Sequence, residues 1–147
     1  MVRIVLGIVV GIAVSMGCIS VVEWLGHQIY PPPVGASMNT PEIVADYIAT
    51  APTMALVFSP LGWFTGAAIG GWAANSISRK HWAGWVIAGL VLVGGIINLF
   101  LIPAPLWMQI AAVAAPLLGG WMATRLPADT RATVRKRLGT NAGRESV

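Results

Sequence analysis

The sequence predicts an all-α membrane protein in which four transmembrane helices form a bundle, with both termini cytoplasmic and a short helix on the outer surface. Composition is the first reason. Of the 147 residues, 56% are hydrophobic and only 10% are charged, whereas soluble domains contain about 25% charged residues. The second reason is that the uncharged residues form long continuous runs. This composition excludes a soluble globular domain, a disordered chain and a coiled coil.

The uncharged runs locate the membrane spans. They cover residues 4–22, 47–78 and 82–124, and a helix needs about 20 apolar residues to cross the hydrocarbon core. The third run is long enough for two helices and contains the sequence Ile-Pro-Ala-Pro at residues 102–105. Because proline has a fixed φ and no backbone donor, we expect a turn there. Each span must be helical, since lipid offers the backbone no hydrogen bonds.

The predicted organisation is one transmembrane domain, residues 1–126, followed by a basic cytoplasmic tail, residues 127–147. The four spans are expected near residues 3–26, 52–77, 82–102 and 105–125. With four spans, all nine basic residues fall on the side of the two termini: Arg3, Arg79, Lys80, Arg125, Arg131, Arg135, Lys136, Arg137 and Arg144. Loops rich in Lys and Arg stay in the cytoplasm, so both termini are predicted to be inside.

The first span has an alternative interpretation as a cleaved leader. Ser15-Met16-Gly17-Cys18 resembles the cleavage box of a bacterial lipoprotein, but an aliphatic and then a small residue are usual where Ser15 and Met16 stand. Apolar residues also continue to Val22. We therefore expect a retained span in which Cys18 is a packing residue, and cleavage stays the alternative.

A short helix is predicted in the outer loop. Asn39-Thr40-Pro41-Glu42 provides a capping hydroxyl, proline at the first helical position and an acid in the first turn. The turns that follow place a set of apolar side chains on one face: Ile43, Val44, Tyr47 and Ile48. This pattern suits a helix on the membrane surface, as a cap over the bundle or as a gate.

Small residues recur every four positions in three of the spans. The predicted packing glycines are Gly7 and Gly11 in the first span, Gly62, Gly66 and Gly70 in the second, and Gly119 in the fourth. Residues four apart share a helix face, and small side chains there let two backbones approach closely. The spacing predicts helix contacts, either within the chain or with a second copy or another membrane protein.

Four polar side chains form the candidate site. Glu23, His27, Asn98 and Gln109 all lie toward the outer side by topology, and the first two share one helix face because they are four residues apart. An ionisable residue inside a membrane segment indicates a functional site. The opposing interpretation is a structural Glu–His pair near the interface.

No catalytic residue, metal ligand set or cofactor is predicted. A zinc site needs three or four protein ligands, and the second histidine, His81, lies on the opposite face of the membrane. The tail is basic but has no interleaved aromatic residues, so we expect contact with anionic lipid and no nucleic-acid binding.

Three segments resemble a group of small bacterial four-span membrane proteins of unknown function. They are the E-x-x-x-H-x-x-Y-P-P-P run at residues 23–33, Gly-Gly-Trp-Ala-Ala at 70–74 and Ile-Pro-Ala-Pro-Leu-Trp at 102–107. The resemblance implies a multi-pass protein of the bacterial cytoplasmic membrane and carries no activity, cofactor or partner.

The sequence therefore favours a non-enzymatic structural or accessory protein of the membrane. The alternative is a small oligomeric transporter or channel that uses Glu23 and His27 at its outer mouth. A metal-dependent membrane enzyme is disfavoured by the number of available ligands. A close-packed bundle would favour the accessory role, and a water-filled path from Glu23 to the cytoplasm would favour transport.

Overall fold

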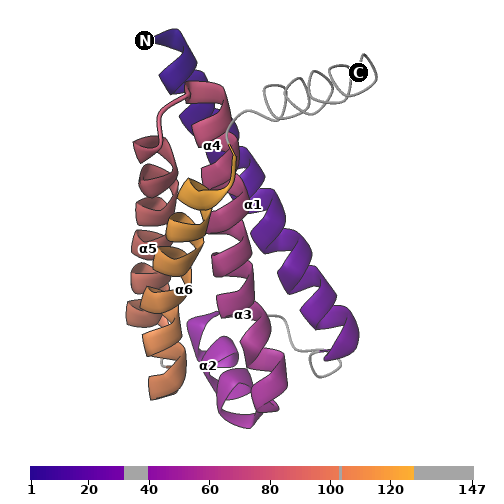
Figure 1. Ribbon diagram of the computed structural model, residues 1–147. Helices are drawn as coiled ribbons and strands as arrows, with labels where there is room; N and C mark the ends of the chain where they lie inside the picture. Colours follow the sequence, from indigo (N-terminus) through magenta and orange to yellow (C-terminus); the bar gives the residue numbers. More distant parts are fainter. Residues whose placement is uncertain (32–39, 103, 128–147) are drawn as a thin grey trace, which may run out of the picture.

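A computed structural model describes residues 1–31, 40–102 and 104–127 (Figure 1). All of the regular secondary structure in these ranges is helical. The elements are α1 (Val2–Ile29), α2 (Pro41–Thr50), α3 (Thr53–Thr65), the π-helical turn η1 (Gly66–Gly70), α4 (Gly71–Ser78), α5 (Trp82–Leu101) and α6 (Leu106–Arg125). The predicted all-α fold is thus confirmed.

Four helices are long and apolar enough to cross a membrane, as expected of a multi-pass protein: Val2–Ile29, Thr53–Ser78, Trp82–Leu101 and Leu106–Arg125. They match the predicted spans to within three residues at each end. The second of them is continuous and consists of α3, η1 and α4. The predicted tail lies outside the described residues apart from Pro127.

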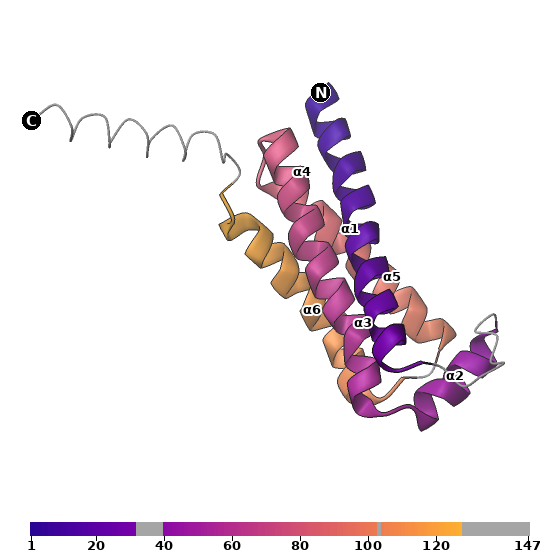
Figure 2. The same ribbon diagram turned by 90° about the vertical axis from the view of Figure 1, so that its right-hand side faces the viewer.

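The second span is the centre of the bundle. It packs against α1 on one side and against α5 and α6 on the other, as Figures 1 and 2 show. Half of its most apolar stretch is buried, compared with 17% for α1. Most of the α1 surface is therefore left to face lipid, which suits its all-round apolar sequence.

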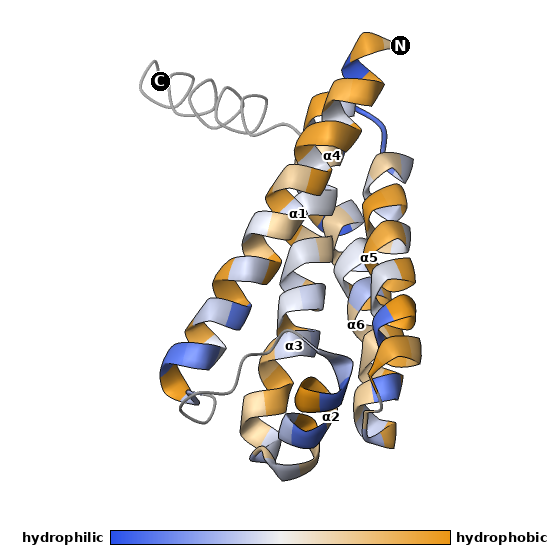
Figure 3. Cartoon of the chain, turned by 180° about the vertical axis from the view of Figure 1, so that it is seen from behind, coloured by the Kyte–Doolittle hydropathy of each residue, from blue (hydrophilic) through white to orange (hydrophobic). Residues whose placement is uncertain are grey.

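Basic and acidic residues lie at opposite ends of the bundle. One end, which we call the terminal end, holds Met1, the turn between α4 and α5, and the last turn of α6 (Figures 1 and 2). The opposite end carries α2 and is called the α2 end. The described basic residues Arg3, Arg79, Lys80 and Arg125 lie at the terminal end, and Glu23, Glu42 and Asp46 lie at the α2 end. Figure 3 shows hydrophilic residues on α2 and on the last turns of α1.

Glycines of the first two spans lie against each other's backbones. A Cβ atom on Gly70 would lie 2.6 Å from the Gly11 carbonyl oxygen, and one on Gly66 would lie 3.0 Å from that of Ser15. A Cβ on Gly7 would lie 2.9 Å from the Ala74 carbonyl oxygen. Gly66 and Gly70 therefore face α1, and Gly7 faces the second span. The two helices approach so closely at these positions that no side chain fits between them.

The π-helical turn keeps the small residues of the second span on α1. In a regular α-helix each step of four residues rotates the stripe by about 40°, so five positions in a row would turn away from a straight partner. A π turn is wider and counters this rotation. From Gly62, which lies nearest Ile19, to Ser78 beside Gly7, the stripe follows α1 along its length.

Candidate functional site

The helix α2 begins at Pro41, as the sequence predicts, although the predicted capping hydrogen bond does not form. Pro41 occupies the first turn and Glu42 follows it. Thr40 has the extended backbone of an N-cap residue, but its hydroxyl makes no capping hydrogen bond, so that part of the prediction was wrong. The apolar face of α2 turns toward the bundle, and its acids Glu42 and Asp46 are exposed.

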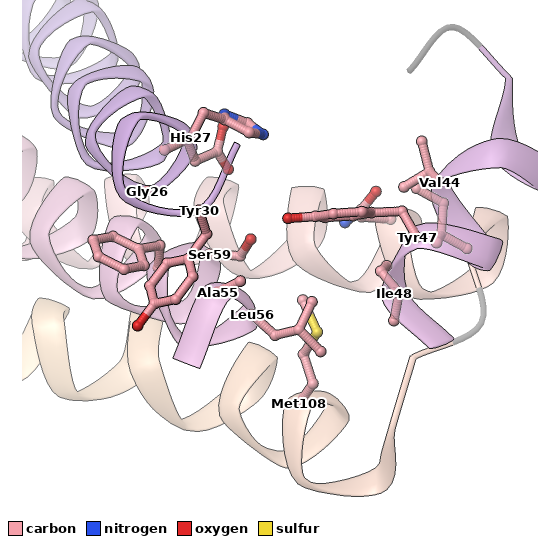
Figure 4. Close-up of a pocket in the computed structure, with 14 residues that line it drawn as sticks. Gly26, His27, Tyr30, Val44, Tyr47, Ile48, Ala55, Leu56, Ser59 and Met108 are labelled. Carbon is pink, nitrogen blue, oxygen red and sulfur yellow. The ribbon is translucent and has the colours of Figure 1, made fainter. Parts of the chain in front are cut away.

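A cavity of about 280 Å³ lies between α2 and the ends of the other helices. Its polar lining side chains come from α1 and its C-cap, α2, α3 and α5: Glu23, His27, Tyr30, Tyr47, Ser59 and Asn98. Met108 adds an apolar contribution from α6. In Figure 4 the ring of Tyr47 extends across the space with its hydroxyl directed toward α1 and α3. The helix α2 thus acts as one wall of the cavity.

The structure brings three of the four predicted site residues together. Glu23, His27 and Asn98 line the cavity, and Glu23 and Asn98 are half-buried. Gln109 is exposed and is not among the lining residues. Its Nε2 donates a hydrogen bond of 2.9 Å to the Ala104 carbonyl oxygen, at the turn between α5 and α6. The amide of Gln109 is therefore used locally.

Two aromatic residues support the cavity from the α1 side. The rings of Tyr30 and Phe58 pack with their centroids 6.2 Å apart and their planes tilted by 60°. A Cβ on Gly26 would lie 2.8 Å from Phe58, so this glycine lets the last turns of α1 rest on α3. The E-x-x-x-H run indicated Glu23 and His27, but Phe58 and Ser59 carried no sequence signal beyond lying in a span.

The six polar side chains that line the cavity make no hydrogen bond to another described residue. The same ranges contain no group of three or more His, Cys, Asp or Glu side chains placed to hold a metal ion. The cavity is thus a mixed polar and apolar site with one carboxylate.

A second buried polar group, at the terminal end, was missed by sequence reasoning. Asn75 is only 1% exposed. Its Oδ1 accepts a 2.7 Å hydrogen bond from the Gly84 N–H in the first turn of α5, and its Nδ2 donates one of 3.2 Å to the Ala123 carbonyl oxygen in the last turn of α6. Those groups have no partner within their own helices. Asn75 therefore joins three helices, and its isolated amide in an apolar span was the available signal.

No family model, curated protein or solved structure matches the chain. Of the two polar regions, the one at Asn75 is closed, and both polar atoms of its amide are hydrogen-bonded. The α2-end cavity is the candidate functional site.

Proposed function

We propose that the chain is a non-enzymatic structural or accessory protein of the bacterial cytoplasmic membrane. The observation that carries this proposal is the close packing of the spans in the middle of the bundle. Gly11 and Gly70 place two backbones in direct contact, with no room for a side chain between them. Such packing favours a rigid bundle over a water-filled path. The resemblance to small bacterial four-span proteins supports the membrane setting alone and not the role.

The proposed orientation places both termini in the cytoplasm and α2 on the outside. It is supported by the separation of Arg3, Arg79, Lys80 and Arg125 from the acids of the α2 end, because basic residues are retained on the cytoplasmic side. The tail would then lie beside the anionic inner leaflet, where each basic residue contributes about 1 kcal/mol.

Cysteine labelling tests this orientation. In a Cys18→Ser background, Glu42→Cys and Lys80→Cys place one thiol at each end of the bundle, and both parent residues are exposed. A membrane-impermeant maleimide added to intact spheroplasts should label Glu42→Cys alone. Labelling of Lys80→Cys alone would reverse the orientation, and equal labelling of both would contradict the four-span topology.

The accessory role predicts a lasting neighbour in the membrane. Met16 lies on the outer face of α1 and is 65% exposed. A photo-crosslinking residue placed there should give one discrete adduct in native membranes, formed with a second copy or with another membrane protein. Crosslinking to lipid only, at Met16 and at Leu118 of α6, which is 56% exposed, would contradict this role.

The cavity favours a second candidate, a small oligomeric transporter or channel with an outward-facing Glu23–His27 site. Reconstitution separates the two proposals. For the accessory role, vesicles containing the protein should conduct protons and potassium no faster than protein-free vesicles. For the transporter, a flux should appear and Glu23→Gln should abolish it while the fold survives.

A further inference from the structure

We propose that the α2-end cavity binds a small organic ammonium ion, with the Glu23 carboxylate as its counter-charge. This inference goes beyond the proposed function, because an accessory protein requires no small ligand. Nor does it depend on that function, because it concerns a site within one copy of the chain.

The cavity has the size and construction of a ligand site. Its volume of about 280 Å³ exceeds that of a choline-sized molecule, and its walls come from five different helices. Ligand sites are typically largely apolar cavities with a few polar groups that set orientation. Here Leu56, Ile48 and Met108 supply apolar surface, while Ser59 and Asn98 supply a hydroxyl and an amide that bond to no other described residue.

The charge of the cavity lining selects a cation. Glu23 lines the cavity, whereas the exposed acids Glu42 and Asp46 of the neighbouring α2 do not. The sequence has no Lys or Arg between Arg3 and Arg79, or between Lys80 and Arg125. Among the described residues that line the cavity, one is basic, His27, and it is exposed. An anionic ligand would thus meet a carboxylate without a fixed opposing charge.

The lining favours an organic cation over a metal ion. Divalent ions are held mainly by charged oxygen ligands, and Glu23 is the one carboxylate among the described lining residues, which contain no group of three or more His, Cys, Asp or Glu side chains. The faces of aromatic rings attract ammonium groups, and methylated ammonium ions suit aromatic and apolar walls. Tyr30, Tyr47 and Phe58 line this cavity, with the Tyr47 ring extending across it (Figure 4).

The ammonium group could belong to a free ammonium compound or to a lipid headgroup, because the proposed orientation places the α2 end at the membrane surface. The shared chemistry is a single positive nitrogen with small alkyl substituents. Both sources would place that nitrogen near Glu23 and the Tyr47 ring. The test therefore contains one arm for each source.

Choline chloride is the probe, titrated into the full-length protein in nanodiscs of phosphatidylglycerol, with calorimetry and melting temperature as readouts. Choline should bind saturably and raise the melting temperature. Lithium chloride at equal ionic strength, and the uncharged isostere 3,3-dimethylbutan-1-ol, should do neither. Equal effects of choline and its neutral isostere, or no saturable binding of choline, would overturn the proposal.

Matched variants connect the binding to the cavity. Glu23→Gln should weaken choline binding at least tenfold, and Tyr47→Leu should weaken it by a similar factor. The control Glu42→Gln removes an exposed acid of α2 that does not line the cavity, and its affinity should stay within twofold of the parent value. Unchanged binding by a folded Glu23→Gln variant would refute the site.

The lipid arm repeats the titration in nanodiscs that also contain phosphatidylcholine. A headgroup in the cavity would compete, so the apparent affinity for free choline should fall in proportion to its content. An unchanged affinity would identify a free ammonium compound as the ligand. Because the readout is binding to purified protein, it is independent of the crosslinking and flux experiments on the proposed function.

Discussion

The terminal end and the α2 end each contain an asparagine within a membrane helix, and they use it in opposite ways. Asn75 is almost fully buried and forms two hydrogen bonds, to backbone groups of α5 and α6. Asn98 is half-buried, lines a cavity and has no hydrogen-bond partner among the described residues. A polar group whose bonds are all internal specifies helix packing, whereas an uncommitted one beside a cavity is available to a ligand.

The second span also packs more closely against α1 toward the terminal end than toward the α2 end. At Gly70, toward the terminal end, a Cβ would lie 2.6 Å from the Gly11 carbonyl oxygen. At Gly62, toward the α2 end, the nearest atom is the Ile19 carbonyl oxygen at 3.5 Å, which is an ordinary contact. Both glycines belong to one stripe in the sequence, so spacing alone does not distinguish the closed region from the looser one.

The largest expected effect tests this packing difference. Gly70→Ala should lower the free energy of unfolding by about 3 kcal/mol, because the new methyl group forces two backbones apart. Gly62→Ala should change it by less than about 1 kcal/mol, since space is available and alanine favours the helix. Unfolding in mixed micelles with increasing SDS measures both. Equal losses for the two variants would remove the distinction between the regions.

The two asparagines give the next largest difference. Asn75→Ala should cost about 2 kcal/mol, because the Gly84 N–H and the Ala123 carbonyl oxygen are left without a partner. Asn98→Ala should cost less than about 0.5 kcal/mol, since no described hydrogen bond is lost. The same unfolding assay compares them. A loss at Asn98 as large as that at Asn75 would indicate that the cavity is held together by its polar groups.

Sequence reasoning predicted the fold well because its signals are local. Span length, the prolines near residue 103 and the Pro41-Glu42 helix start each depend on neighbouring residues. The contacts of Asn75 with Gly84 and Ala123 depend on the arrangement of three helices. For the same reason depth alone grouped Gln109 with the site, although its amide bonds to Ala104. The π turn at Gly66–Gly70 also had no local signature.

A substitution in the turn between α4 and α5 should increase stability, unlike those above. Arg79 has φ of 56°, a left-handed conformation that costs a side-chain-bearing residue about 1 kcal/mol. Arg79→Gly should therefore raise the free energy of unfolding by about 0.5–1 kcal/mol. Lys80→Gly, at a position without a positive φ, should lower it by a few tenths to 1 kcal/mol. The same sign for both would mean that backbone strain does not decide this turn.

The smallest expected effect concerns the Glu23–His27 pair and bears directly on the ligand proposal. These side chains lie one helical turn apart, and no hydrogen bond or ion pair within 4.0 Å joins them in the described ranges. Ion pairs at this spacing on a helix contribute about 0.3–0.5 kcal/mol. A double-mutant cycle with Glu23→Gln and His27→Gln should therefore give a coupling energy below about 0.5 kcal/mol. A coupling above 1 kcal/mol would show that the Glu23 charge is already committed to His27, and Glu23 would then resemble Asn75 in using its polar group within the protein. A small coupling would leave the carboxylate available, as binding of a cation in the cavity requires.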